Sequence, residues 1–130
     1  LKSLKRWVDG YQNPLQFKWA IVFDNEVVGS IDVVHLEEKL DAVEIGYALS
    51  RKCWGKGIMT EALIAVIYYL LEEAGCNRVA ARHDVNNPAS GKVMQKAGMT
   101  YEGTLRQYGK NNQGICDMAY YSIIKADRLK

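Results

Sequence analysis

The stretch Arg51–Gly75, RKCWGKGIMTEALIAVIYYLLEEAG, joins a basic turn with two glycines to the longest helical pattern in the chain. Gly55 and Gly57 lack a Cβ atom, so their backbone N–H groups can approach an anion closely. The predicted helix, residues 57–74, adds unpaired N–H groups and the positive end of its dipole at the same point. The turn therefore predicts a phosphate-binding loop. A simple turn is the alternative interpretation of two glycines before a helix.

The composition limits the class of protein. The chain has 130 residues, enough for one domain with a sizeable core. Its formal net charge of +2 does not favour a nucleic-acid-binding protein. The sequence contains neither a long apolar run nor a signal-peptide pattern, so it does not predict a membrane protein. Three widely spaced cysteines, Cys53, Cys76 and Cys116, indicate reduced thiols in a cytoplasmic protein and offer no metal-ligand spacing. Because the chain starts within an amphipathic pattern at Leu1, we expect residues 1–130 to be one domain that lacks its N-terminal part.

Hydrophobic periodicity predicts the order of the elements. Helical spacing in residues 1–11 predicts the end of a helix. Three strands follow, the first two in a hairpin, at residues 17–23, 27–36 and 43–50. After the long helix we expect a strand at 78–85, parallel to the third strand, and a second helix from Pro88 to Gly98. The last two strands are expected at 100–105 and 115–124, joined by a polar loop at 109–114. The final strand is also a candidate for edge pairing with a second copy in a homodimer.

The third strand has two unlike faces. Val43, Ile45, Tyr47 and Leu49 form the apolar face, while Glu44 is the one carboxylate among small residues on the other. This pattern predicts an open trough beside a charge, unless a bulge reverses the alternation partway along.

Four motifs in this order resemble the GNAT superfamily of acetyl-coenzyme A N-acetyltransferases, and its bacterial RimJ/RimL-type branch in particular. They are Glu44-Ile45-Gly46-Tyr47, Trp54-Gly55-Lys56-Gly57, Asn87-Pro88-Ala89-Ser90 and Gln95-Lys96-Ala97-Gly98-Met99. The resemblance spans residues 17–124 and implies an α+β fold. The expected sheet is mixed and mostly antiparallel, with a β-α-β crossover and helices on both faces. From this resemblance we expect the first strand and first helix of the family to be missing from the chain.

The resemblance implies acetyl-CoA as cosubstrate and assigns residues to it. The pantetheine arm is expected to pair with a free backbone edge near Tyr47, Ala48 and Leu49, where a bulged third strand separates from the fourth. The pyrophosphate loop comprises Lys52, Cys53, Trp54, Gly55, Lys56, Gly57, Ile58 and Met59. Lys52 departs from the Gln or Arg usual in the family, which keeps a positive charge but loses planar bidentate geometry. Asn87 is expected both to cap its helix and to contact the pantetheine.

Two residues are predicted to take part in the chemistry. Glu44 is the first choice for a general base, acting through a water molecule; a strand glutamate paired with Arg82 is the alternative interpretation. Ser90 lies where the family places a hydroxyl near the coenzyme sulfur, and is expected to donate to the leaving thiolate. An ordinary serine in the first turn of a helix is the alternative there. Cys53 lacks an identifiable histidine partner, so direct attack by the amine, without a covalent enzyme intermediate, is expected.

The implied function is transfer of an acetyl group to a protein N-terminal amine or a small-molecule amine. An α-amino group, with a pKa near ~8, needs less help from a base than a lysine with a pKa near ~10.4. A non-catalytic acyl-CoA-binding regulatory module is the alternative function. A nucleotide enzyme is disfavoured because both the P-loop and the dinucleotide-binding glycine motif are absent from the sequence. His83 is expected to pack in the core, and His35 to lie on the surface.

Overall fold

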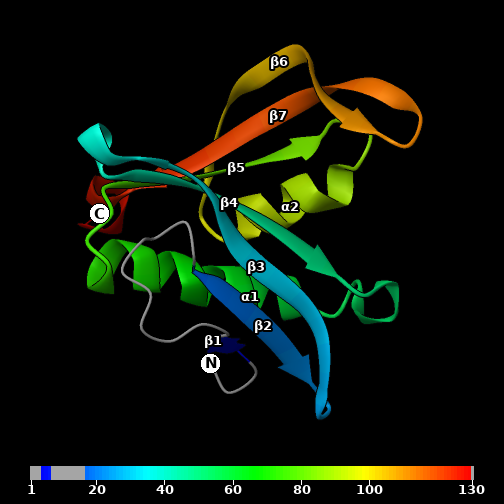
Figure 1. The fold of residues 1–130 in the computed structure, drawn as a ribbon, viewed down its shortest axis with the longest axis horizontal. Helices are drawn as coiled ribbons and strands as arrows, with labels where there is room; N and C mark the ends of the chain where they lie inside the picture. Colours follow the sequence, from blue (N-terminus) through cyan, green and yellow to red (C-terminus); the bar gives the residue numbers. More distant parts are fainter. Residues whose placement is uncertain (1–3, 7–16, 130) are drawn as a thin grey trace.

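The computed structural model describes residues 4–6 and 17–129, which form one curved seven-stranded sheet with two helices (Figure 1). The sheet order is β1-β2-β3-β4-β5-β7-β6, and of the neighbouring pairs only β4–β5 is parallel. The strands are Leu4–Arg6, Lys18–Phe23, Glu26–Glu37, Ala42–Leu49, Arg78–Asp84, Thr100–Asn111 and Gly114–Ile124, numbered β1 to β7. Helix α1 is Ile58–Tyr68 and α2 is Pro88–Lys96. The mixed, mostly antiparallel sheet with a β-α-β crossover is as predicted.

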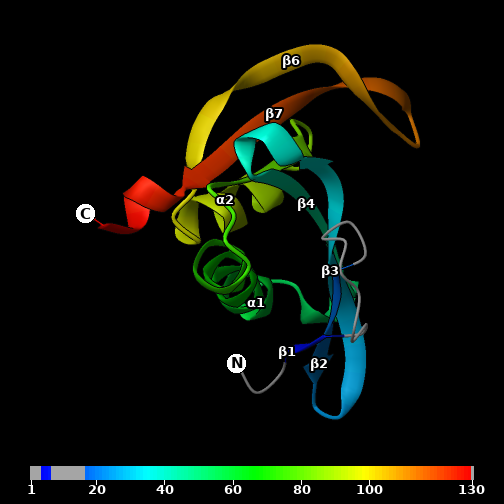
Figure 2. The same ribbon diagram turned by 60° about the vertical axis from the view of Figure 1, so that its left-hand side comes forward.

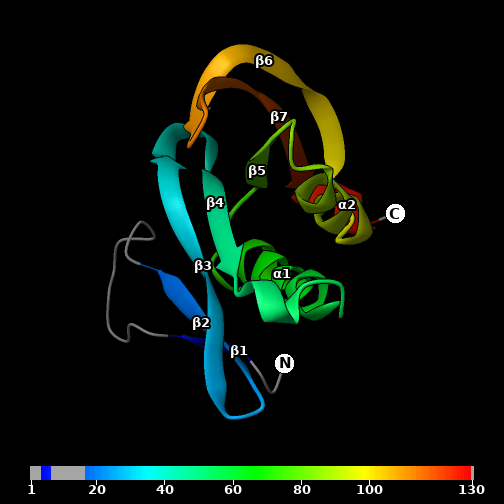
Figure 3. The same ribbon diagram turned by 90° about the vertical axis from the view of Figure 1, so that its right-hand side faces the viewer.

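Both helices pack against the same concave face of the sheet, as Figures 2 and 3 show. The sequence led us to expect helices on both faces, so the described residues differ from that expectation. The reason is the alternation of the central strands. Val43 and Ile45 of β4, with Val79 and Ala81 of β5, make one continuous buried face. The other face carries Glu44, which lies 3.2 Å from Arg82 of β5.

The predicted apolar stripe of the long helix forms the centre of the core. Its buried members are Met59, Ala62, Leu63, Val66, Ile67, Leu70 and Leu71. The helix ends in one wider π turn, Tyr69–Glu73, and Gly75 adopts the left-handed conformation (φ +80°) expected of a helix stop. Tyr69 of this helix packs edge-on against Phe17 and Trp19.

Three local predictions were wrong. Leu4–Arg6 is a strand that pairs with β2, rather than part of a helix; the other residues of the predicted segment 1–11 lie outside the described residues. The polar loop predicted at 109–114 is mostly strand, because β6 and β7 stay paired up to Asn111 and Gly114. The final strand, β7, lies between β5 and β6, so it has no free edge for a second copy.

A gap between β4 and β5 is the feature that positions the site. The two strands pair only at Ala42–Arg78, Val43–Val79 and Glu44–Ala80, and then diverge (Figure 1). The predicted separation is therefore present. The bulge, however, lies in β3, where Val34 is inserted between two residues that pair with Ile45 and Glu44. Because β4 itself is regular, its alternation is not reversed and Glu44 keeps the face that the sequence predicted.

Candidate active site

The loop before α1 has the backbone shape that anion binding requires. Gly55 and Gly57 are both left-handed, with φ of +77° and +76°, and α1 begins directly after them at Ile58. A Cβ atom built on either glycine would meet no described atom within 4 Å. The space above these glycines is thus open, and it is bordered by the unpaired N–H groups of a helix N-terminus.

Side chains of the same loop divide into anchors and exposed groups. Cys53, Ile58 and Met59 are buried, so they hold the loop on the core and offer only backbone atoms to a ligand. The exposed Trp54 donates its indole N–H to the carbonyl oxygen of Leu49 at 2.9 Å. This hydrogen bond ties the loop to the end of β4, so the two predicted coenzyme-binding segments are held together.

Lys52 faces a carboxylate in the structure. Its Nζ lies 2.7 Å from Glu26 Oε2, and both side chains are mostly exposed, at 65% and 63%. This hydrogen bond raises the pKa of the Lys52 ammonium and lowers the pKa of the Glu26 carboxyl. The charge that the sequence predicted to serve the loop is therefore shared with the turn between β2 and β3. Lys56, by contrast, lies with its Nζ 5.8 Å from the ring centre of Phe23.

The edge of β4 that faces the gap runs along the predicted pantetheine-binding residues. No described residue of β5 pairs with Tyr47, Ala48 or Leu49. The other edge is satisfied by β3, in pairs with Ile31, Ser30 and Gly29. The structure thus brings a strand edge that is unpaired with β5 beside the glycine loop, with the Leu49 carbonyl oxygen bonded to Trp54.

Ser90 and Tyr47 meet on the helix side of this gap. The Ser90 Oγ and Tyr47 hydroxyl oxygens are 2.7 Å apart, and the Tyr47 hydroxyl also lies 3.2 Å from the Ser90 carbonyl oxygen, which can accept its proton. Burial raises the pKa of the Tyr47 phenol, and the hydrogen bond with Ser90 partly opposes that shift. Asn87 occupies the N-cap position of α2 as predicted, but its side chain makes no capping hydrogen bond in the described structure.

His83 packs under α2, where it is half-buried rather than part of the core that the sequence predicted for it. Its ring lies 5.7 Å from that of Tyr121, and a Cβ atom on Gly91 would come within 2.7 Å of His83 Nε2. His83 Nδ1 lies 2.7 Å from the carbonyl oxygen of Asp84. These contacts fix the first turn of α2, and hence Ser90, against β5.

Glu44 lies on the opposite face of β4 from Tyr47, at the last pair before the strands diverge. Its side chain is 18% exposed, and its Oε2 lies 3.2 Å from Arg82 Nε in an ion pair. The ion pair with Arg82, which the sequence suggested as the alternative to a base, is therefore present. His35 is the partner of Glu44 on β3 and is exposed, as predicted.

Two tyrosines hold Arg82 in place. Its guanidinium donates to the Tyr120 hydroxyl at 2.8 Å and lies 5.7 Å and 5.8 Å from the ring centres of Tyr108 and Tyr120. We call Glu44, Arg82, Tyr108 and Tyr120 the Glu44 cluster. Three aromatic or hydrogen-bonding contacts fix the guanidinium, so the orientation of the Glu44 carboxylate is fixed with it.

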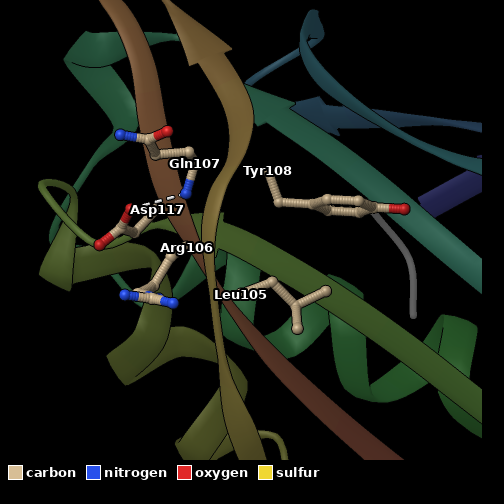
Figure 4. A pocket seen from close by; sticks show the side chains of 5 residues that line it. All are labelled: Leu105, Arg106, Gln107, Tyr108 and Asp117. Atoms are coloured by element: carbon tan, nitrogen blue, oxygen red, sulfur yellow. Dashed lines mark hydrogen bonds between the residues drawn. The ribbon is translucent and has the colours of Figure 1, made fainter.

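A bulge in β6 places Tyr108 in this cluster. Residues 106–108 stand opposite the single residue Asp117 of β7, and Gln107 is left-handed at φ +53°. The Gln107 N–H donates to Asp117 Oδ1 at 2.8 Å, which anchors the bulge. These residues line an open depression of about 710 Å³, and Tyr108 points away from Gln107 and Asp117 (Figure 4). Sequence reasoning missed this feature, because nothing in the local pattern distinguishes Asp117 from any other polar strand residue.

Within the described part of the chain, no helix is long and apolar enough to cross a bilayer.

Comparisons with known proteins agree with this architecture. The family model described as "Acetyltransferase (GNAT) domain" matches residues 1–100. The uncharacterized N-acetyltransferase YoaA of Bacillus subtilis is 32% identical over 117 residues, which are 88% of this chain and 66% of that protein. The ribosomal-protein-serine acetyltransferase of Escherichia coli is 31% identical over 82% of this chain and 60% of its own length.

Among solved structures, a RimL alpha-N-protein acetyltransferase in complex with coenzyme A superposes with a TM-score of 0.78. It is 28% identical, over 83% of this chain and 61% of that one. The chain thus spans about two-thirds or less of the length of these relatives. The matched domain covers well over half of the chain, and the chain therefore belongs to the GNAT acetyltransferase family.

Proposed function

We propose that this protein is an acetyl-CoA-dependent N-acetyltransferase that moves the acetyl group directly to a primary amine. One juxtaposition carries the proposal. The open glycine loop at the start of α1 lies beside a gap in the sheet, with Ser90 on one face and Glu44 on the other. A diphosphate, an extended thioester arm and an amine each find a complementary surface there.

The residues present fit the coenzyme. The open space above Gly55 and Gly57 leaves the N–H groups of the loop and of the first turn of α1 accessible to a pyrophosphate. The free edge at Tyr47 and Ala48 offers backbone groups to the amides of a pantetheine arm. When bound, the coenzyme supplies the activated acetyl thioester. A backbone N–H of this stretch is suited to polarise the thioester carbonyl, and one such donor is typically worth about a hundredfold or more in rate.

For the acceptor, we propose a protein N-terminal α-amine. At about pH 7.4 roughly one α-amino group in five is already neutral, against about one lysine in a thousand. The Arg82 guanidinium neutralises part of the charge of Glu44, so an acceptor that needs little base catalysis suits this site best. The E. coli relative is named as a ribosomal-protein-serine acetyltransferase, which agrees with a protein acceptor.

The ion pair also supports the second candidate, a non-catalytic acyl-CoA-binding module. A carboxylate committed to Arg82 serves such a module as a structural group. The two candidates differ in turnover, since both predict coenzyme binding.

The test measures free thiol release from acetyl-CoA in the presence of peptides with free N-termini, peptides with blocked N-termini and one internal lysine, or small amines. We expect release with the free N-termini, and a loss of at least tenfold with the lysine peptide. Glu44→Gln is compared with Glu73→Gln, an exposed glutamate at the end of the long helix. Stabilisation of the protein by acetyl-CoA without thiol release from any amine would overturn the transferase proposal in favour of the binding module.

A further inference from the structure

The hydroxyl pair of Tyr47 and Ser90 can be hydrogen-bonded in two ways. In the first, Tyr47 donates to the Ser90 carbonyl oxygen at 3.2 Å, and Ser90 Oγ donates to the Tyr47 oxygen. The serine proton is then used within the pair. In the second, Tyr47 donates to Ser90 Oγ at 2.7 Å, which frees the serine proton to reach a third group. Tyr47 therefore decides where the Ser90 proton points.

Acidity shows why this matters for a leaving thiolate. A thiol has a pKa near ~8.5 and a phenol near ~10, whereas an aliphatic hydroxyl resembles water, near ~15.7. A serine that protonates a thiolate and stays an alkoxide moves its proton uphill by an equilibrium factor of about 10⁷. If the proton is replaced from a phenol of ordinary pKa, the factor falls to about 30, and the raised pKa of Tyr47 makes it larger than that. Ser90 alone is therefore a poor proton donor to the thiolate, whereas Ser90 is an adequate donor when Tyr47 replaces its proton.

We propose that Tyr47 is a positioning residue of the leaving-group step, which orients the Ser90 hydroxyl and restores its proton as that proton passes to sulfur. The inference rests on the proposed transferase function. The C–S bond of the tetrahedral intermediate breaks, and an S–H bond forms with the Ser90 proton. The Tyr47 O–H bond breaks as Ser90 Oγ–H re-forms. The phenolate then takes a proton from solvent, which has received the proton lost by the attacking amine.

The surroundings of Tyr47 suit this role. From β3, its cross-strand partner is Ile31, which is fully buried and apolar. From α2, Ser90 is the group that contacts the phenol, and no described charged group contributes to the shift of the Tyr47 pKa. On β5 the nearest titratable side chain of this face is His83, which packs against Gly91 and has its Nδ1 next to the Asp84 carbonyl. A neutral phenol at neutral pH follows from such surroundings, as a proton donor requires.

The experiment compares Tyr47→Phe, Ser90→Ala and the double variant with Tyr101→Phe. Tyr101 is a matched control, since its hydroxyl also lies 2.7 Å from a side-chain hydroxyl, that of Thr104, on exposed β6. We expect kcat to fall about a hundredfold in Tyr47→Phe and Ser90→Ala, and the double variant to be no slower than the slower single one. The KM for acetyl-CoA should stay within about twofold, and Tyr101→Phe should match the wild type.

The pH profile separates a proton supply from a structural link. Wild-type kcat should fall at alkaline pH as Tyr47 ionises, and Tyr47→Phe should lack that limb. A fluorinated tyrosine at position 47 keeps the hydrogen bond and lowers the phenol pKa, so it should retain activity with the alkaline limb at lower pH. If Tyr47→Phe fails to fold, the fluorinated variant still distinguishes a proton supply from a structural link. An active wild type with unchanged kcat in Tyr47→Phe, or with only a raised KM for acetyl-CoA, would overturn this inference alone. A wild type inactive with every amine would overturn the proposed function and this inference with it.

Discussion

Substituting Gly57 by alanine should separate coenzyme binding from folding. Gly57 is left-handed, at φ +76°, and no described atom lies within 4 Å of the position of an added Cβ. The methyl group therefore meets no steric clash inside the protein. The expected cost is backbone strain of about 1–2 kcal/mol in the free energy of unfolding. If the loop binds the pyrophosphate as proposed, however, we expect the methyl group to occupy space that the anion needs to approach the loop N–H groups.

The loss of binding can be estimated from hydrogen bonds to a charged group. Each is worth about 1.5–3 kcal/mol, so the loss of one or two weakens acetyl-CoA binding about a hundredfold. At a ligand concentration of about 100 times the wild-type Kd, the ligand adds roughly 2.7 kcal/mol to wild-type stability, and about 0.4 kcal/mol to the variant. For a chain of this length, these values correspond to increases in Tm of roughly 10 °C and 1–2 °C.

The assay is thermal unfolding with and without acetyl-CoA, and Gly75→Ala is its control. Gly75 has nearly the same conformation, φ +80°, with the same open space around its Cβ position, but it lies at the other end of the helix. Both variants should lose similar stability without ligand, and only Gly57→Ala should lose the ligand-induced increase in Tm. An undiminished increase in Gly57→Ala would refute the assignment of this loop to the pyrophosphate.

Three further predictions follow from other contacts. Gly29→Ala places a Cβ 2.4 Å from the carbonyl oxygen of Ala48, a backbone atom that cannot move alone; urea unfolding should show a loss of about 1–3 kcal/mol, and a change below about 0.5 kcal/mol would contradict the close approach. Asp117→Ala removes the acceptor for the N–H of the β6 bulge, which places Tyr108 against Arg82 of the Glu44 cluster. Because we propose that the amine binds beside Glu44, the KM of the amine should rise while that of acetyl-CoA stays constant. Equal changes in both would argue against a role of the bulge in amine binding. Glu102→Gln breaks the ion pair with Arg78, whose hydrogen bond lowers the pKa of the Glu102 carboxyl below 4.5. This pair stabilises the folded state above that pH and loses its effect as the pH falls through the lowered pKa. The free energy of unfolding of the variant should therefore be about 0.2–1 kcal/mol lower than that of the wild type at pH 7, and the difference should vanish in acid.

Much of the fold could be predicted because short local sequence patterns specify several of its elements. The apolar stripe of α1, the left-handed stop at Gly75 and Pro88 at the start of α2 are each encoded within a few residues. The β6–β7 hairpin was harder. Its tip contains polar residues that normally mark a loop, and their strand conformation depends on cross-strand pairing such as Lys110 with Ile115.

In the candidate site, too, local sequence predicts some features, and contacts between distant segments determine the others. Glycine spacing revealed the loop, and alternation revealed the face of Glu44. The partners of these groups come from distant segments: Glu26 for Lys52, Tyr47 for Ser90 and Asp117 for the β6 bulge. No local pattern specifies such pairs, because each depends on how strands far apart in the sequence are brought together. The Glu44–Arg82 pair could be suggested because both residues lie on neighbouring strands of a β-α-β unit.

The divergence of β4 from β5 has a consequence for solubility as well as for binding. Unpaired strand edges usually promote aggregation, because they accept a strand from another molecule. Here the unpaired edge is recessed within the sheet and closed at one end by the three pairs from Ala42 to Glu44. A folded neighbour cannot insert its own sheet into such a slot, whereas a slender, flexible, amide-containing chain can. We therefore expect this strand edge to pair with an extended, amide-containing chain more readily than with a strand of another folded copy.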